Sequence, residues 1–254
     1  MSNDMPQNEL SDDSGRADDS GRASGGPDGV AALPEWMRQA FSPPRMGEYL
    51  RSAGGDASLA VQLYWWNIEV SQAFYLPLKC LEVAVRNALH DRLRERYERA
   101  DWWQTALLTP NSRRLIDEAA AECRRRGRGQ PTPDDVVARL SFGFWVALVS
   151  SSYTRILWVP ALHRAFPGYS GRRDDLHRRL NTLRLLRNRI GHHEPIHHRD
   201  LAADHATLYR LLGFIGQELA TGVRLHDGVP AVLARRPGLP EMAVPACGKA
   251  SARG

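Results

Sequence analysis

Residues 183–196 read LRLLRNRIGHHEPI, and they form the end of a longer periodic stretch. From Leu176 to Ile190, apolar residues recur at steps of three and four positions, which places them on one face of a helix. A second, polar stripe falls on a neighbouring face and comprises His177, Asn181, Arg184, Asn188 and His192. Glycine and proline follow and end the helical pattern. The stretch predicts an amphipathic helix over residues 170–190 that carries polar side chains at its C-terminal end.

Arg187 interrupts the apolar face of this predicted helix. On a helical wheel its position falls between Leu176 and Leu180. An arginine there needs an anionic partner or a wet cleft, because an unpaired buried charge is very costly. Glu82 falls in the same way on the apolar face of another predicted helix. We therefore predict a Glu82–Arg187 pair, which is either a structural salt bridge or a device that orients Arg187 for chemistry.

The end of the helix carries a family resemblance. Arg187-Asn188-x-x-x-His192 resembles the R-N-x-x-x-H signature of HEPN-domain ribonucleases. The wider block RNRIGHHEPI is similar to one in bacterial Abi-like (abortive-infection) proteins, which usually have alanine where this chain has Gly191. Three further blocks fit the same family in order: residues 81–89 (LEVAVRNAL), residues 140–145 (LSFGFW), and Leu157-Trp158 with Ala165-Phe166-Pro167. The resemblance extends over about residues 49–237.

The resemblance implies a fold, a site and an assembly. It implies a four-helix, up-down core in which the motif ends the third core helix and the last helix follows. It also implies that Arg187 and His192 are a catalytic pair of an endoribonuclease, and that two copies of the chain form a homodimer with both motifs in a shared cleft. The family association suggests a toxin that arrests a phage-infected cell, in abortive-infection defence.

The residue types suit RNA cleavage without a metal or another cofactor. RNA supplies its own 2′-hydroxyl nucleophile, so the protein must supply a base, an acid and a cation for the charged phosphorane. His192 suits either proton role, and Arg187 offers a fork for two phosphate oxygens. Asn188 can orient the imidazole or hold the phosphate. One histidine cannot easily be both acid and base, so the second is His192 of another copy or His193.

Other polar residues are expected to support this site or to bind RNA. The supporting residues are Glu82, Arg86, Asn87, His193 and Glu194. The RNA-binding residues are Arg184, Arg189, Arg172 and Arg173. Two other interpretations stay open. One is a zinc site in the cluster of His192, His193, Glu194, His197 and His198, which Pro195 interrupts. In the other, Arg187 is a bridged core arginine and His192 interacts with the helix dipole.

Charge and composition agree with an RNA partner and a cytoplasmic location. The net charge of the 254-residue chain is +5. Residues 1–30 contain seven acids and two arginines, a net charge of −5, so the remaining residues carry +10. A basic body favours a polyanion such as RNA, including tRNA. No apolar run reaches the ~18 residues of a membrane span, no secretory signal is present, and the three cysteines are isolated. We expect no membrane association.

Helical periodicity dominates the chain, and no stretch alternates with period two, so the expected fold is all-α. We expect a disordered acidic tail over residues 1–32, a helical domain over residues 33–237, and a flexible tail over residues 238–254. Helices are expected over residues 33–41, 42–50, 111–125, 154–166 and 199–222, and from residue 56 onward with a kink or restart at Pro77. The aromatic residues near position 144 are expected to lie in the core.

Two rival functions come from other classes. A non-catalytic RNA- or nucleotide-binding module would use the same arginine and asparagine for recognition alone. A protein-interaction partner, similar to an antitoxin, would bind no RNA and would bind another protein through an apolar surface.

Overall fold

A computed structural model describes residues 32–126 and 130–238. Within these residues the chain forms only helices, turns and loops, which confirms the all-α prediction. The predicted tails, residues 1–32 and 238–254, lie almost wholly outside the described residues.

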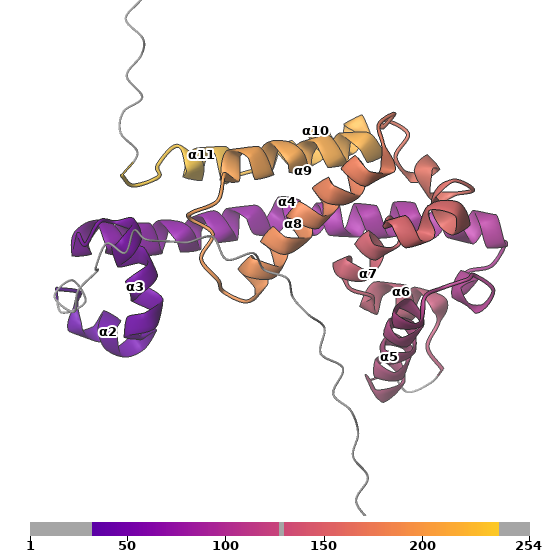
Figure 1. Ribbon diagram of the computed structural model, residues 1–254, viewed down its shortest axis with the longest axis horizontal. Helices are drawn as coiled ribbons and strands as arrows, with labels where there is room; N and C mark the ends of the chain where they lie inside the picture. Colours follow the sequence, from indigo (N-terminus) through magenta and orange to yellow (C-terminus); the bar gives the residue numbers. More distant parts are fainter. Residues whose placement is uncertain (1–31, 127–129, 239–254) are drawn as a thin grey trace, which may run out of the picture.

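The longest helix, α4 (Ala57–Tyr97), is the axis of the molecule (Figure 1). Its first turn is capped by the side chain of Asp56, which accepts a hydrogen bond from the backbone N–H of Leu59 at 3.0 Å. The helix continues through Pro77, where the sequence predicted a kink or a restart. Proline removes one backbone donor, but Phe74 and Leu78 on either side are buried in the core. Packing on both sides therefore keeps the helix continuous.

The motif helix, α8 (Arg173–Gly191), crosses α4 diagonally (Figure 1). It begins three residues later than predicted. Its apolar face is fully buried and comprises Leu176, Leu180, Leu183 and Leu186. α9 (Leu201–Ile215) packs against both α4 and α8, so these three helices contact one another. The short helix α7 (Phe142–Ala147) also packs against both α4 and α8.

The C-terminal segment differs from the single helix predicted over residues 199–222. The helix breaks at Gly216, whose backbone is extended, and α10 (Gln217–Arg224) folds back along α9. The fold brings Arg224 over the ring of Tyr209, 4.0 Å from its centroid. Near this break, Gly168 lies so close to the backbone of α9 that a Cβ atom would meet the Gly213 carbonyl oxygen at 3.0 Å. The reversal is therefore a product of tertiary packing.

The helix predicted over residues 154–166 is also absent as a single element. The chain instead forms a π-helical turn, η3 (Thr154–Trp158), and a 3-10 turn, η4 (Leu162–Ala165). Pro160 lies between them and has no N–H to continue a helix.

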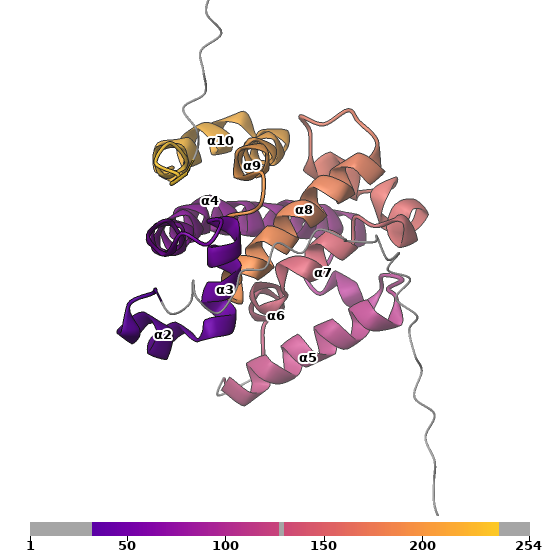
Figure 2. The same cartoon turned by 60° about the vertical axis from the view of Figure 1, so that its left-hand side comes forward.

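The other elements surround this centre. They are α2 (Glu35–Phe41), α3 (Pro43–Ser52), η1 (Trp102–Gln104), α5 (Pro110–Arg126), α6 (Pro133–Arg139), η2 (Ser151–Tyr153) and α11 (Val229–Leu233). Figures 1 and 2 show α9, α10 and α11 on one side of α4, and α5 and α6 on the opposite side. α2 and α3 pack on the start of α4 around a second apolar cluster that includes Met46, Tyr49 and Leu63.

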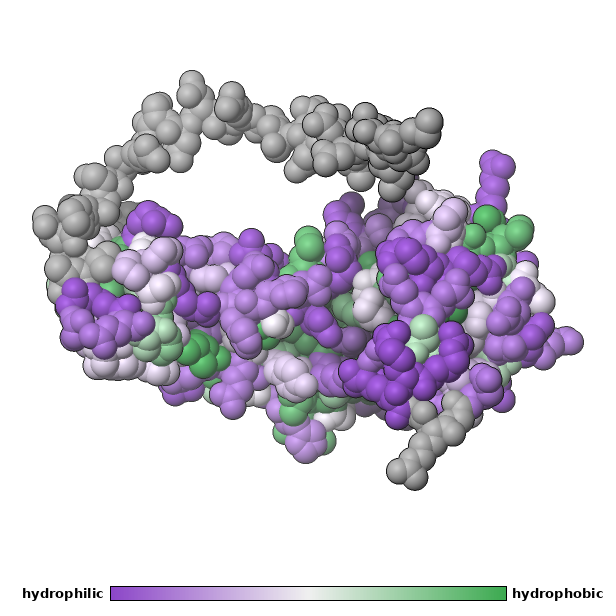
Figure 3. Space-filling model, turned by 90° about the horizontal axis from the view of Figure 1, so that it is seen from below, coloured by the Kyte–Doolittle hydropathy of each residue, from purple (hydrophilic) through white to green (hydrophobic). Residues whose placement is uncertain are grey.

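The predicted core aromatics are confirmed, since Phe142, Phe144 and Trp145 are buried. On the face seen in Figure 3, hydrophilic residues dominate and apolar residues form small separate patches. Among the helices of the described residues, none combines the length and apolar character that a membrane crossing requires.

Candidate functional site

The polar motif lies at the C-terminal end of α8, as the sequence predicted. Arg187 and Asn188 belong to the last turns of the helix, and His192 is its C-cap residue. The backbone N–H of His192 donates to the carbonyl of Asn188 at 2.9 Å. His193 then takes a left-handed conformation with φ of 59°, and the Glu194 N–H donates to the Arg189 carbonyl at 2.8 Å. These backbone hydrogen bonds fix the end of α8 and hold the residues of the motif on its last turns and in the turn that follows.

The predicted Glu82–Arg187 pair is confirmed. The Arg187 Nε lies 3.2 Å from the Glu82 Oε2, which joins α8 to α4. Arg187 has both the anionic partner and the access to solvent that its position required, because 46% of its side chain is exposed, against 16% for Glu82. The carboxylate therefore holds one edge of a guanidinium that still reaches solvent.

A hollow of about 310 Å³, the motif pocket, surrounds this pair. It is lined by Tyr75, Leu78, Lys79, Glu82, Arg187, Ile190 and Gly191. Lys79 is exposed and adds a second cation to the lining beside Arg187. A pocket with two cations and one carboxylate has the charge to accept an anionic group such as a phosphodiester.

Some of the remaining predicted site residues lie close to the C-terminal end of α8, and others lie far from it. His192, His193 and Glu194 are exposed directly after the helix, and Glu194 lies 3.8 Å from Arg189. Arg86 follows Glu82 by one turn of α4, and its Nε donates to the Asn87 Oδ1 at 3.2 Å. The structure therefore places Arg187, Asn188, His192, His193 and Glu194 at the C-terminal end of α8 and brings Glu82 of α4 to Arg187, whereas no hydrogen bond or ion pair joins Arg86 or Asn87 to the motif in the part of the chain that the structure describes.

The four arginines predicted to bind RNA have different surroundings. Arg184 donates to Asn181 at 2.9 Å, and Arg189 donates to the carbonyl of Pro195 at 3.2 Å. Arg172 and Arg173 lie at the opposite end of α8, about 30 Å from His192 by helix rise.

Arg173 is a correction to the sequence prediction. Only 9% of its side chain is exposed, and its guanidinium donates to the carbonyl of Val149 at 2.6 Å. This internal bond occupies the group that would contact RNA, so we exclude Arg173 from the binding surface.

Sequence reasoning missed the residues that hold the chain after the motif. Asn67 of α4 is 4% exposed, and its Oδ1 accepts the backbone N–H groups of Ile196 at 2.8 Å and His197 at 3.1 Å. Arg45 of α3 donates to the carbonyl of His193 at 2.6 Å. Asn67 lies between the buried Trp66 and Val70 on α4. A polar residue on that apolar face was the signal that would have identified it.

His197 is buried and engaged in contacts within the fold. Its ring is buried, stacks on Tyr49 at 4.8 Å between centroids, and shares a hydrogen bond of 2.9 Å with the Ser52 hydroxyl. His192 and His193, in contrast, are exposed. Over the residues that the structure describes, no three His, Cys, Asp or Glu side chains form a group that could hold a metal ion.

The burial of His197 predicts a pH dependence of stability. Burial lowers the pKa of His197 below its ordinary value, and the nearby His198 adds to this effect. The unfolded chain, with a histidine pKa of ~6.5, then binds more protons than the folded chain as the pH falls below that value. The free energy of unfolding should therefore decrease between pH 7.5 and 5.5, as measured by urea denaturation.

His197→Phe keeps an aromatic ring against Tyr49 and removes the titration, so its free energy of unfolding should decrease less over the same range. Burial also lowers the pKa of His90, which leaves a residual dependence in this variant. The exposed His226 offers a matched control, and His226→Phe should retain the wild-type dependence. An unchanged dependence in His197→Phe would contradict the assignment.

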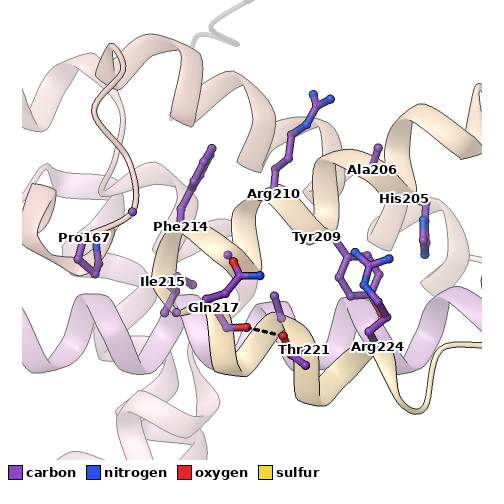
Figure 4. A pocket seen from close by; sticks show the side chains of 14 residues that line it. Pro167, His205, Ala206, Tyr209, Arg210, Phe214, Ile215, Gln217, Thr221 and Arg224 are labelled. Carbon is purple, nitrogen blue, oxygen red and sulfur yellow. Dashed lines mark hydrogen bonds between the residues drawn. The ribbon is translucent and has the colours of Figure 1, made fainter.

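A larger hollow of about 850 Å³ lies away from the motif, between α9 and α10 (Figure 4). Some of the polar groups in or beside its lining contact one another. His205 contacts the carboxylate of Asp227 at 2.6 Å, and Arg224 covers the ring of Tyr209. Figure 4 also shows Thr221 bonded to the Gln217 carbonyl, at 3.0 Å. None of the predicted site residues lines this hollow.

Comparisons with models of protein families, with curated proteins and with solved structures give no match to this chain. The residues of the site are therefore the basis for assigning a function.

Proposed function

We propose that this protein is a metal-independent endoribonuclease that uses Arg187, Asn188 and His192. The Glu82–Arg187 pair carries the proposal. A carboxylate from α4 holds the Nε edge of the guanidinium at 3.2 Å, and nearly half of the arginine side chain remains exposed. The other nitrogens of the Arg187 guanidinium can bind a phosphate. His192 is exposed and lies at the C-terminal end of the same helix.

The proposed reaction requires no metal and uses the RNA, Arg187, His192 and a second imidazole. His192 accepts the proton of the ribose 2′-hydroxyl, and the 2′-oxygen attacks the adjacent phosphorus. Arg187 stabilises the charge that develops on the phosphorane oxygens. The bond from phosphorus to the 5′-oxygen then breaks, and a protonated imidazole supplies the proton to that oxygen. The products are a 2′,3′-cyclic phosphate and a 5′-hydroxyl.

The acid needs a second imidazole. In a homodimer, His192 of the second copy would supply it in a shared cleft, whereas His193 would supply it within one chain. We include the homodimer in the proposal, because the resemblance to HEPN ribonucleases implies it. From the resemblance to Abi-like proteins, we further propose a toxin role in phage defence, with RNA, including tRNA, as the substrate.

The test is cleavage of total RNA and of tRNA by the purified protein in EDTA. We expect cleavage with cyclic-phosphate and 5′-hydroxyl ends. His192→Ala, purified identically, controls for contaminating nuclease. Cleavage that requires added metal would contradict the mechanism and favour the histidine cluster. RNA binding without cleavage would contradict catalysis and favour the binding module, and no RNA binding would favour the protein-interaction partner.

A further inference from the structure

A third hollow, of about 820 Å³, lies beside the motif pocket, and we call it the flanking pocket. Its walls come from the α2–α3 junction, from the exposed side of α4, and from the turn after α8. Three residues, Tyr75, Ile190 and Gly191, line both the flanking pocket and the motif pocket. A ligand in the motif pocket can therefore extend directly into the flanking pocket.

The lining of the flanking pocket combines aromatic and apolar surface with a few polar groups. Phe41, Ile68 and Tyr75 supply apolar surface, and Gln72 supplies an amide. The ring of Tyr75 is available, since 65% of this residue is exposed. An aromatic face beside an amide suits a flat ligand with hydrogen-bonding edges, because bases stack on aromatic side chains and amides read base edges.

The flanking pocket also contacts the turn that follows α8, which contains His193 and Glu194. Arg45, which lines the pocket, donates to the carbonyl of His193 at 2.6 Å. Glu194 is the one carboxylate in the lining. Its Oε2 lies 3.8 Å from the Nε of Arg189, which balances its negative charge. The charge around the pocket is therefore compatible with the phosphates on either side of a bound base.

We propose that the flanking pocket holds a nucleobase next to the scissile phosphodiester and thereby sets the base preference of cleavage. This inference rests on the proposed ribonuclease function. Tyr75 stacks on the base, and Gln72 bonds to its edge. A nucleobase fits the flanking pocket better than an apolar surface of a second copy does. The pocket has polar groups in its lining, and it shares three lining residues with the motif pocket.

The first test measures binding, so that it does not depend on cleavage. RNA oligonucleotides with 2′-O-methyl groups cannot be cut by attack of the 2′-oxygen. We expect Tyr75→Ala to raise the Kd for such an oligonucleotide about 5- to 100-fold, by loss of one stacked base. Tyr75→Phe keeps the ring and should bind as the wild type does.

The second test measures base preference. Cleavable oligonucleotides that differ in the base on each side of the scissile bond give four values of kcat/KM for each position. We expect Gln72→Ala to make the four kcat/KM values at one position more similar to one another, which is a weaker base preference, while cleavage continues. Gln62→Ala is the matched control, since Gln62 is an exposed glutamine of the same helix that lines neither pocket.

The outcomes separate this inference from the function on which it rests. If the wild type neither binds nor cuts RNA, both are overturned. If the wild type cuts RNA, and Tyr75→Ala and Gln72→Ala keep its affinity and base preference, only the nucleobase pocket is overturned. If sedimentation velocity shows that Tyr75→Ala converts a dimer to a monomer with unchanged RNA affinity and preference, a second copy covers the pocket, which also overturns the inference.

Discussion

His192→Ala is expected to lower the rate of RNA cleavage by about 10²- to 10⁴-fold, the usual contribution of a positioned acid or base. Arg187→Ala is expected to lower it by about 10²- to 10³-fold, because the phosphorane loses its charge-stabilising donor. Both side chains are substantially exposed, so neither change should unfold the protein. Single-turnover cleavage of one defined RNA in EDTA measures both rates, and circular dichroism checks the fold.

His226→Ala is the matched control, since His226 is an exposed histidine away from the motif. It should cleave at the wild-type rate. Wild-type rates for both His192→Ala and Arg187→Ala would remove the motif from the mechanism.

Glu82→Gln separates the two roles of the ion pair. It keeps the shape of the side chain and removes its charge. If Glu82 orients Arg187, the cleavage rate falls by less than in Arg187→Ala while the melting temperature stays close to that of the wild type. If the pair is only structural, the melting temperature falls and the cleavage rate of the folded protein does not change.

Asn67→Leu is expected to lower the free energy of unfolding by about 2–6 kcal/mol. The change removes the oxygen that accepts the backbone N–H groups of Ile196 and His197, and both residues are buried. Each unpaired buried donor costs about 1–3 kcal/mol. Urea denaturation at pH 7.5 measures the loss. The amides of Ile196 and His197 should also exchange with solvent faster, which native-state hydrogen exchange measures.

Asn87→Leu is the control for this prediction, because Asn87 is an exposed asparagine on the same helix. A surface change of this kind is expected to alter stability by about 0.5 kcal/mol or less. Equal stability of Asn67→Leu and Asn87→Leu would mean that Asn67 does not hold the segment after the motif.

The sequence by itself determined the features that depend on helical periodicity. The steps of three and four between Leu176 and Leu186 predicted the buried face of α8, because side-chain direction along a helix repeats every 3.6 residues. The same rule placed Glu82 and Arg187 on the apolar sides of two predicted helices, and their opposite charges led to the prediction that they pair. Local pattern was therefore enough for the all-α fold and for the position of the motif, and it pointed to the ion pair beside it.

The tertiary structure alone decided which polar residues are buried and which are free. Arg187 falls on the apolar side of its helix by periodicity and is half-exposed, whereas Arg173 was predicted to bind RNA and its side chain is nearly buried. His197 looked like its histidine neighbours and instead lies inside, against Ser52. Burial depends on which distant segment covers a residue, and helical periodicity carries no information about that. The break at Gly216 has the same origin, since α10 reverses to pack on α9.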